Sequence, residues 1–165
     1  MPKYPEPSEA NGFLAEHVCL LCESYVSCTG RDLADPGLPK EEIGRWLYFA
    51  PFVVLSHDAA ADPVFTYGNL QALIMFEMSW SELTALPSRL SVEPVSQAER
   101  NRLLADVTAR GFVEHYSGVR ISRTGRRVLI KDVTIWNLLN ENGEYCGQAA
   151  TYYEWIPANR VEPAL

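Results

Sequence analysis

Apolar residues near the N-terminus recur at intervals of three and four, which is the spacing of a helix that buries one face. This pattern predicts a helix over residues 13–29, with Asn11 as a candidate N-cap and Gly30 as its end. A loop rich in proline follows, and the next polar-apolar pattern predicts a second helix over residues 40–49. The chain is therefore expected to begin with two helices.

From residue 52 the pattern changes to β-branched runs separated by turns, which is typical of strands. Two short runs predict a hairpin over residues 52–67, and three longer runs predict a meander of strands over residues 112–156. Helical segments lie between them. Two short helices are expected to begin at the candidate N-caps Asn69 and Ser79, and a longer helix is expected over residues 97–110.

This order of elements predicts an α+β fold with one five-stranded antiparallel sheet. Both alternating sets of side chains in the C-terminal strands contain apolar residues, so both faces of the sheet are expected to be covered. The N-terminal helix is the natural cover of the outer face, which leaves the inner face for a pocket. The expected segments are a flexible tail over residues 1–12, a helical extension over residues 13–49, the sheet domain over residues 50–157 and a C-terminal tail over residues 158–165.

The composition is that of one ordinary globular domain. The chain has 165 residues, of which 47% are hydrophobic, and it contains no apolar run long enough for a membrane span. Its formal net charge of −7 argues against nucleic acid or an anionic membrane as a partner. The N-terminus lacks the pattern of a secretory signal and the four cysteines are too few for a secreted disulfide framework, so a cytoplasmic location with reduced thiols is expected.

Positive charge is concentrated in one part of the chain. Residues 98–131 include eight basic and three acidic side chains, a net of +5, whereas the segments on either side are acidic. The basic residues are Arg100, Arg102, Arg110, Arg120, Arg123, Arg126, Arg127 and Lys131. Such a run is usually a solvated face, and the alternative is a surface that receives a phosphate or an acidic partner protein.

Several segments carry a resemblance to known proteins. The run from Gly68 through Asn69 and a helix to Ser79-Trp80-Ser81-Glu82-Leu83 is similar to the helical part of PAS sensor domains. Other segments resemble the MEKHLA family, which comprises PAS-related domains at the end of certain plant homeodomain-leucine zipper transcription factors and small stand-alone bacterial proteins. These segments are residues 50–57, 86–89, 118–122, 135–138 and 147–151. The resemblance covers residues 13–156 and implies a PAS-like sheet whose concave face is closed by helices.

The resemblance also implies a pocket between sheet and helices, where many PAS domains hold haem, flavin or another small organic molecule. Residues 86–90 correspond to the stretch with the reactive cysteine in flavin photoreceptor PAS domains, and they read Leu-Pro-Ser-Arg-Leu. A flavin–cysteinyl adduct is therefore excluded at that point. Haem PAS domains usually supply a histidine from the helix before the third strand, and residues 97–110 contain none, so ordinary haem ligation is not expected.

Alignment of the turn at Thr124 with the equivalent turn of flavin PAS domains implies which strand residues face the pocket. They are Gly118, Arg120, Ile130, Asp132, Thr134, Ala149 and Thr151. An inward Arg120 and an inward Asp132 are costly unless they are paired, so a buried ion pair between them is the favoured expectation. Two alternatives stay open: a polar ligand held by Arg120, and a register shifted by one residue, which turns every side chain to the other face.

The candidate ligand-binding residues combine this inner face with nearby polar and aromatic side chains. They are His57, Asn69, Phe76, Trp80, Arg89, Tyr116, Arg120, Asp132, Thr134, Trp136 and Thr151. Aromatic residues in such a set suit a flat organic ligand and equally an ordinary core. His57, next to Asp58, has the position of a general base, although a turn histidine without catalytic duty is the commoner case.

His17, Cys19, Cys22 and Cys28 have the composition of a metal site, but they lie within the first predicted helix. On a helix only Cys19 and Cys22 share a face, and the chain has no second Cys-x-x-Cys pair to complete four ligands. Buried helix cysteines are therefore favoured, and no metal site is predicted.

These patterns favour a non-catalytic PAS-like sensory domain. It is expected to bind a small organic molecule between sheet and helices, and to signal by associating with another protein, either in a homodimer or with a separate effector. One alternative is a small α+β enzyme that uses His57 or Asp132 as an acid–base group. The other is a ligand-free dimerisation module that uses the N-terminal helix.

Overall fold

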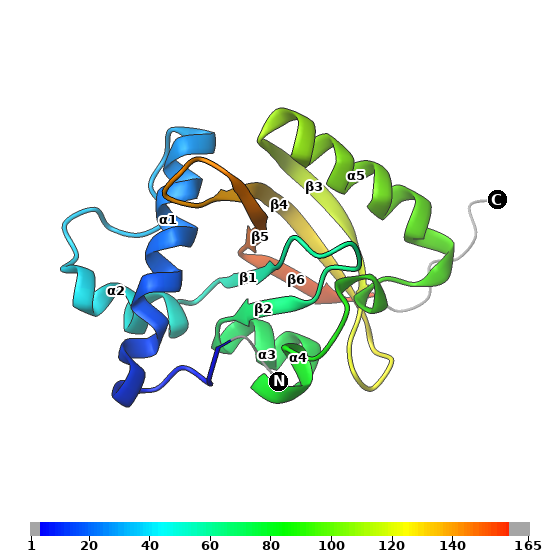
Figure 1. Cartoon of the computed structure of the whole chain (residues 1–165). Helices are drawn as coiled ribbons and strands as arrows, with labels where there is room; N and C mark the ends of the chain where they lie inside the picture. The colour runs from blue at the N-terminus through cyan, green and yellow to red at the C-terminus, as the bar shows by residue number, and fades with distance from the viewer. Residues whose placement is uncertain (1–3, 159–165) are drawn as a thin grey trace.

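A computed structural model describes residues 4–158 of the chain. One antiparallel sheet lies between two helical layers: in Figure 1, helix α1 (Ala15–Thr29) and helix α5 (Gln97–Arg110) lie on opposite sides of the strands. The expected α+β class with a single antiparallel sheet is confirmed. Most of the C-terminal tail expected over residues 158–165 lies outside the described residues.

The N-terminal region is more ordered than the sequence pattern indicates. Glu9–Leu14 forms a 3-10 helix, η1, inside the stretch that includes the expected tail. Asn11 lies within η1, so its expected role as the N-cap of α1 is wrong. The cause is the backbone from Gly12 to Leu14, which has positive φ and separates η1 from α1. Helix α1 ends at Gly30 as expected, with a φ of 73° that suits glycine.

Helix α2 (Lys40–Tyr48) packs beside α1 and η1. The close approach depends on Gly44, because a Cβ at this position would lie 2.5 Å from the carbonyl oxygen of Gly12. The two N-terminal helices therefore form one layer that is joined to the start of the chain.

Within residues 4–158 the sheet contains six strands; five follow the order β2-β1-β5-β4-β3, and β6 pairs with the first part of β4. The strands are β1 (Val53–His57), β2 (Phe65–Gly68), β3 (Phe112–Ile121), β4 (Arg127–Leu139), β5 (Tyr145–Tyr152) and β6 (Glu154–Pro157). The single strand expected over residues 145–156 is interrupted at Tyr153, and its two parts pair with successive parts of β4. The pairing of β1 with β5 places His57 opposite Gln148.

A β-bulge changes which side chains of β4 face the two sides of the sheet. Ile130 pairs with Gly118 of β3, but the next pair is Val133 with Tyr116, so β4 has one residue more than β3 in this step. Asp132, whose φ is 52°, lies in the bulge. Beyond the bulge the alternation is shifted, and Val133 faces inward where an unbroken strand would place Asp132.

Four short helices connect β2 to α5. They are α3 (Leu70–Phe76), α4 (Trp80–Leu83), η2 (Ser88–Ser91) and η3 (Pro94–Ser96). Asn69 and Ser79 cap α3 and α4 as expected, since their side-chain oxygens accept bonds of 3.2 and 3.1 Å from backbone amides. Helix α3 ends early because Glu77 adopts a positive φ. The two 3-10 helices were not expected from the pattern.

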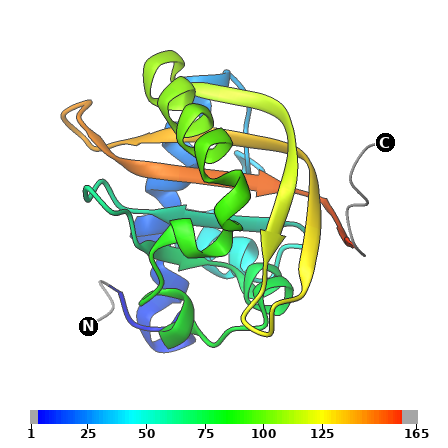
Figure 2. The ribbon, with the colours of Figure 1, turned by 90° about the vertical axis from the view of Figure 1, so that its right-hand side faces the viewer.

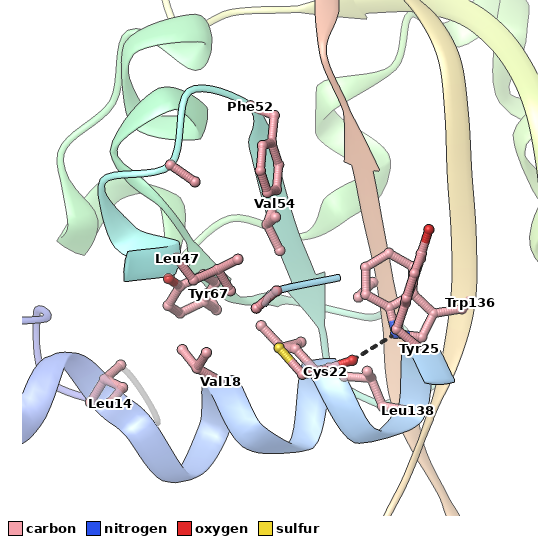
Figure 3. Close-up of a cluster of buried hydrophobic side chains, with 14 of the residues drawn as sticks. Leu14, Val18, Cys22, Tyr25, Leu47, Phe52, Val54, Tyr67, Trp136 and Leu138 are labelled. Atoms are coloured by element: carbon pink, nitrogen blue, oxygen red, sulfur yellow. Dashed lines mark hydrogen bonds between the residues drawn. The ribbon is translucent and has the colours of Figure 1, made fainter. Parts of the chain in front are cut away.

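Two apolar cores lie on the two faces of the sheet. In the outer core, Val18 and Cys22 of α1 point toward Tyr67 and Trp136 of the sheet (Figure 3). The apolar face of α1 is therefore covered by the sheet of its own chain, as the sequence predicts. The inner core lies between the sheet and helices α3, α4 and α5, and Figure 2 shows α5 lying across the strands.

Candidate functional site

A cavity of about 70 Å³ lies between the inner face of the sheet and the segments that cover it. The strands form one wall, and α5 and η2 form the other. Most of the lining is apolar, with Leu55, Phe76 and Ile135 among its residues. The polar residues that line it are Ser56, His57, Ser88, Ser91, Arg100, Arg120 and Gln148. An apolar pocket with a few converging polar groups is the usual form of a ligand site.

His57 is the polar residue at the end of β1, with 9% of its surface exposed. Its Nδ1 lies 2.8 Å from the backbone carbonyl oxygen of Asp58, so this nitrogen carries the proton and donates. Nε2 is buried and has no hydrogen-bond partner among the described residues. Burial lowers the pKa of His57, and the charge of Arg100 lowers it further, so the neutral imidazole presents an acceptor at Nε2.

Arg100 enters the cavity from α5 and is 8% exposed. Its Nη2 donates to the Ser88 hydroxyl at 2.5 Å. Within residues 4–158 it forms no ion pair, and Asp62, a carboxylate close enough to influence it, is paired with Arg89. Burial and the nearby charge of Arg120 both lower the pKa of Arg100. Its positive charge is therefore poorly compensated.

Arg120 enters from β3, on the other side of the cavity. Its Nη1 donates to the Val119 carbonyl at 3.1 Å, and its guanidinium lies 5.6 Å from the ring centre of Tyr116. In the described part of the chain it too forms no ion pair. Two guanidinium groups thus line one small cavity, and neither is neutralised by a carboxylate.

Gln148 connects the floor of the cavity to its cover. It is 1% exposed, and its Nε2 lies within 3.1–3.2 Å of the Leu104 carbonyl, the Thr108 hydroxyl and the Asn137 side-chain oxygen. These bonds join β5 and β4 to α5. Gln148 also lies close enough to His57 for its side chain to raise the pKa of the imidazole, but the buried Nε2 of His57 has no hydrogen-bond partner at bonding distance among the described residues.

The structure brings together only part of the residue set derived from the sequence. His57, Phe76 and Arg120 line the cavity. Tyr116 lies just behind Arg120 and packs against the inner core. Arg89 is exposed beside the cover, where its Nε lies 3.0 Å from Asp62.

The other candidates face away from the cavity. Trp80 and Trp136 lie in the outer core, where their indole N–H groups donate to backbone carbonyls at 3.1 and 3.2 Å. Thr151 and its strand partner Thr134 lie on the same outer side, and Thr151 donates to the Val53 carbonyl. The expectation that Thr134 and Thr151 face inward is wrong, because the bulge in β4 shifts the alternation.

The side chain of Asn69 uses all its hydrogen-bonding groups within the fold. Its Oδ1 accepts from the amides of Val54 and Ala72, and its Nδ2 donates to the carbonyls of Leu47 and Phe52, with all four distances between 2.7 and 3.2 Å. An amide side chain has two donor hydrogens and an oxygen with two lone pairs, so no capacity is left for a ligand. Asn69 joins α2, β1 and α3.

Asp132 is on the surface rather than in the cavity. Its side chain is 73% exposed and its Oδ1 lies 2.6 Å from Nδ1 of His115, which is itself 79% exposed. The expected buried pair of Arg120 with Asp132 is therefore wrong. The register is shifted only beyond the bulge, so Asp132 and Thr134 leave the inner face, whereas Arg120 and Ile130 keep the inward direction that the alignment implies.

Arg100, Ser88 and Gln148 were missed as site residues. Arg100 precedes Leu103 and Val107 of the same helix at a spacing that places all three on one face, and that spacing was the available signal. Ser88 lies in a 3-10 helix for which the sequence has no periodic pattern. Gln148 shares the inward face of β5 with Ala150 and Tyr152, but which face of the strand turns inward depends on the register.

The cavity does not fit the cofactors common among PAS domains. Pockets for drug-sized molecules span about 300–1,000 Å³, several times the volume of about 70 Å³ found here. None of its lining residues is a cysteine. Cys22, on α1, is buried in the outer core, and burial raises its pKa to about 12. In residues 4–158 no group of three or more His, Cys, Asp or Glu side chains is arranged to hold a metal ion.

The fold is that of the PAS sensory domains. The PAS domain of a protein from Colwellia psychrerythraea superposes with a TM-score of 0.59 at 11% identity, over 67% of this chain and 92% of that one. The light-state dimer of the fungal blue-light photoreceptor Vivid superposes with a TM-score of 0.55 at 16% identity, over 92% of this chain and 98% of that one. At these identities the similarity shows the fold alone.

The family is established by sequence. The model of the MEKHLA domain matches residues 15–157, nearly the whole chain, and the chain therefore belongs to the MEKHLA domain family. The homeobox-leucine zipper protein ATHB-9 of Arabidopsis thaliana is 26% identical over 145 residues. That match covers 82% of this chain and 17% of the plant protein. No helix among residues 4–158 has the length and hydropathy that a membrane span requires.

Proposed function

We propose that this MEKHLA domain is a non-catalytic sensory module that binds a small molecule between sheet and helices. The observation that carries the proposal is the cavity, in which an unpartnered acceptor of His57 and two arginines without carboxylates meet inside an apolar wall. Arg100 is buried and Arg120 is half-buried, and neither has a carboxylate partner among the described residues. Because buried ions are costly without partners, a bound molecule that supplies negative charge offsets this cost.

The signal is proposed to leave the domain by association with another protein, either a second copy or a separate effector. Arg100 and the hydrogen bonds of Gln148 link the cavity to α5, so a bound molecule that attracts Arg100 changes the position of this helix. The opposite side of α5 is exposed and polar, and it includes Arg102, Asp106 and Arg110. A shift of α5 therefore changes a surface that a partner protein can contact.

An acid–base enzyme has less support than a binding module. The enzyme hypothesis uses His57 together with Asp132 as titrating groups, but Asp132 lies on the surface with His115. His57 Nδ1 donates to a backbone carbonyl rather than to a carboxylate, so no charged group orients it as a base.

The test is a panel of small molecules of all charge types, followed by thermal unfolding and native mass spectrometry. A ligand of the cavity raises the melting temperature of the wild type and loses this effect in Ala150→Val, which adds two carbons to the lining. Ala105→Val, on the exposed side of α5, is the matched control and keeps the effect. Sedimentation with and without the ligand then measures self-association. The proposal would be contradicted if no molecule in the panel raises the melting temperature of the wild type and loses this effect in Ala150→Val.

A further inference from the structure

The identity of the ligand is restricted by the charge in the cavity. Arg100 and Arg120 approach the cavity from α5 and β3, and the charge of Arg120 lowers the pKa of Arg100. Among the described residues no carboxylate pairs with either. Guanidinium groups bind carboxylates with two parallel hydrogen bonds, which makes an anion with a planar carboxylate the natural counterion.

The cavity also restricts the size and the apolar part of that anion. Its volume of about 70 Å³ is less than half of the ~150 Å³ cavity that holds benzene, so only a few non-hydrogen atoms fit. Phe65, Val133 and Tyr152 contribute to a mostly apolar wall. An inorganic oxyanion would place charge against this wall, whereas a short organic acid places carbon there.

His57 adds a third requirement. Its buried Nε2 lacks a hydrogen-bond partner, and Nδ1 holds the ring proton by donating to the Asp58 carbonyl. An unpartnered buried acceptor is costly, and a hydroxyl group on the ligand removes this cost by donating to Nε2. A carboxylate without a donor leaves the acceptor unpaired.

We propose that the cavity binds a short carboxylate that carries a hydroxyl group, of the size of glycolate, with the carboxylate between Arg100 and Arg120 and the hydroxyl donating to His57. This inference rests on the proposed function and specifies the ligand class. The anion neutralises the two arginines and draws Arg100 toward β3. Occupancy of the site is thereby coupled to the position of α5.

The experiment is a calorimetric titration in Tris chloride with glycolate, acetate, glycolamide and inorganic phosphate. We expect glycolate to bind more tightly than acetate, and acetate more tightly than the neutral glycolamide or phosphate. Arg100→Gln and Arg120→Gln are each expected to weaken glycolate about tenfold or more, because each removes a charged hydrogen-bonding group. Arg102→Gln, on the exposed side of the same helix, is the matched control and leaves binding unchanged.

Several results would overturn the inference. Equal binding of glycolamide and glycolate, equal weakening by Arg102→Gln, or phosphate binding more tightly than glycolate each contradicts a specific carboxylate site. Equal affinity for acetate and glycolate contradicts the role of His57. If a neutral molecule from the broader panel binds in a manner blocked by Ala150→Val while no carboxylate binds, the ligand class is wrong and the sensory function stands. Circular dichroism of each variant verifies that it is folded.

Discussion

Asp132 Oδ1 lies 2.6 Å from His115 Nδ1, and both residues occupy bulges of the β3–β4 ladder at which the backbone has positive φ. The bulge of β4 adds one residue to that strand, and the next step along the ladder adds one residue to β3. The two shifts cancel, so the strands stay paired over their full length. The consequence for the site is that Arg120 faces the cavity without the carboxylate that an unbroken register would bring to it.

This arrangement predicts that Asp132 contributes little to stability. Exposed ion pairs contribute about 0–1 kcal/mol, whereas removal of one partner of a buried pair costs about 3–5 kcal/mol. Asparagine tolerates positive φ, so Asp132→Asn keeps the bulge. We expect its free energy of unfolding in urea to change by less than about 1 kcal/mol. A loss of several kcal/mol would show that Asp132 is buried against Arg120 after all.

Asn69 is expected to be among the most sensitive polar positions of the chain. Asn69→Ala removes four buried hydrogen bonds that join α2, β1 and α3. Since the backbone groups left behind are buried, we expect a loss of about 3–5 kcal/mol in urea unfolding. Ser79→Ala removes only an exposed N-cap bond and is expected to cost about 1 kcal/mol. Similar losses for the two variants would contradict the joining role of Asn69.

The elements of the fold could be predicted well from the sequence because their signals are local. The caps at Asn69 and Ser79, the end at Gly30 and the apolar period of α5 all depend on residues within a few positions of one another. The break at Tyr153 and the kink before α1 were missed, since each depends on how the chain packs against other elements. Family resemblance then supplied the arrangement of the elements.

The site could be predicted only in part. Bulges carry no periodic signal, and one extra residue at Asp132 moves a charged side chain from the cavity to solvent. Of the eight basic residues in the positive stretch, Arg123, Arg126 and Arg127 pair with glutamates, whereas Arg100 and Arg120 turn inward. The sequence composition of that stretch does not distinguish an arginine on the surface from one that faces the cavity. Only the three-dimensional arrangement shows which arginines turn inward.

Stability is expected to depend on the protonation of His57. Burial lowers its folded pKa below the unfolded value of about 6.5, so the unfolded chain binds the proton first as the pH falls. The contribution of His57 to the free energy of unfolding is therefore fully present above about pH 6.5 and is lost progressively below it. We expect the free energy of unfolding of the wild type to fall more steeply between neutral and mildly acidic pH than that of His57→Gln. Parallel pH profiles would show that the buried imidazole does not titrate differently in the fold.

The cysteines of α1 are expected to differ in reactivity. Burial raises the pKa of Cys22 to about 12, well above that of an ordinary thiol, which lowers its thiolate fraction by roughly a thousandfold. Iodoacetamide labelling of the native protein, followed by peptide mass spectrometry, should therefore modify Cys22 more slowly than the partly exposed Cys19. In denaturant the two rates should converge. Equal native rates would contradict the burial of Cys22 under the sheet.

The most direct test of the central claim is a crystal structure of the protein soaked with glycolate. We predict electron density for the anion inside the cavity, with carboxylate oxygens about 2.7–2.9 Å from guanidinium nitrogens of Arg100 and Arg120 and the hydroxyl oxygen within hydrogen-bonding distance of His57 Nε2. A cavity that holds only water, or one filled by repacked side chains, would contradict the claim that this MEKHLA domain encloses a carboxylate site.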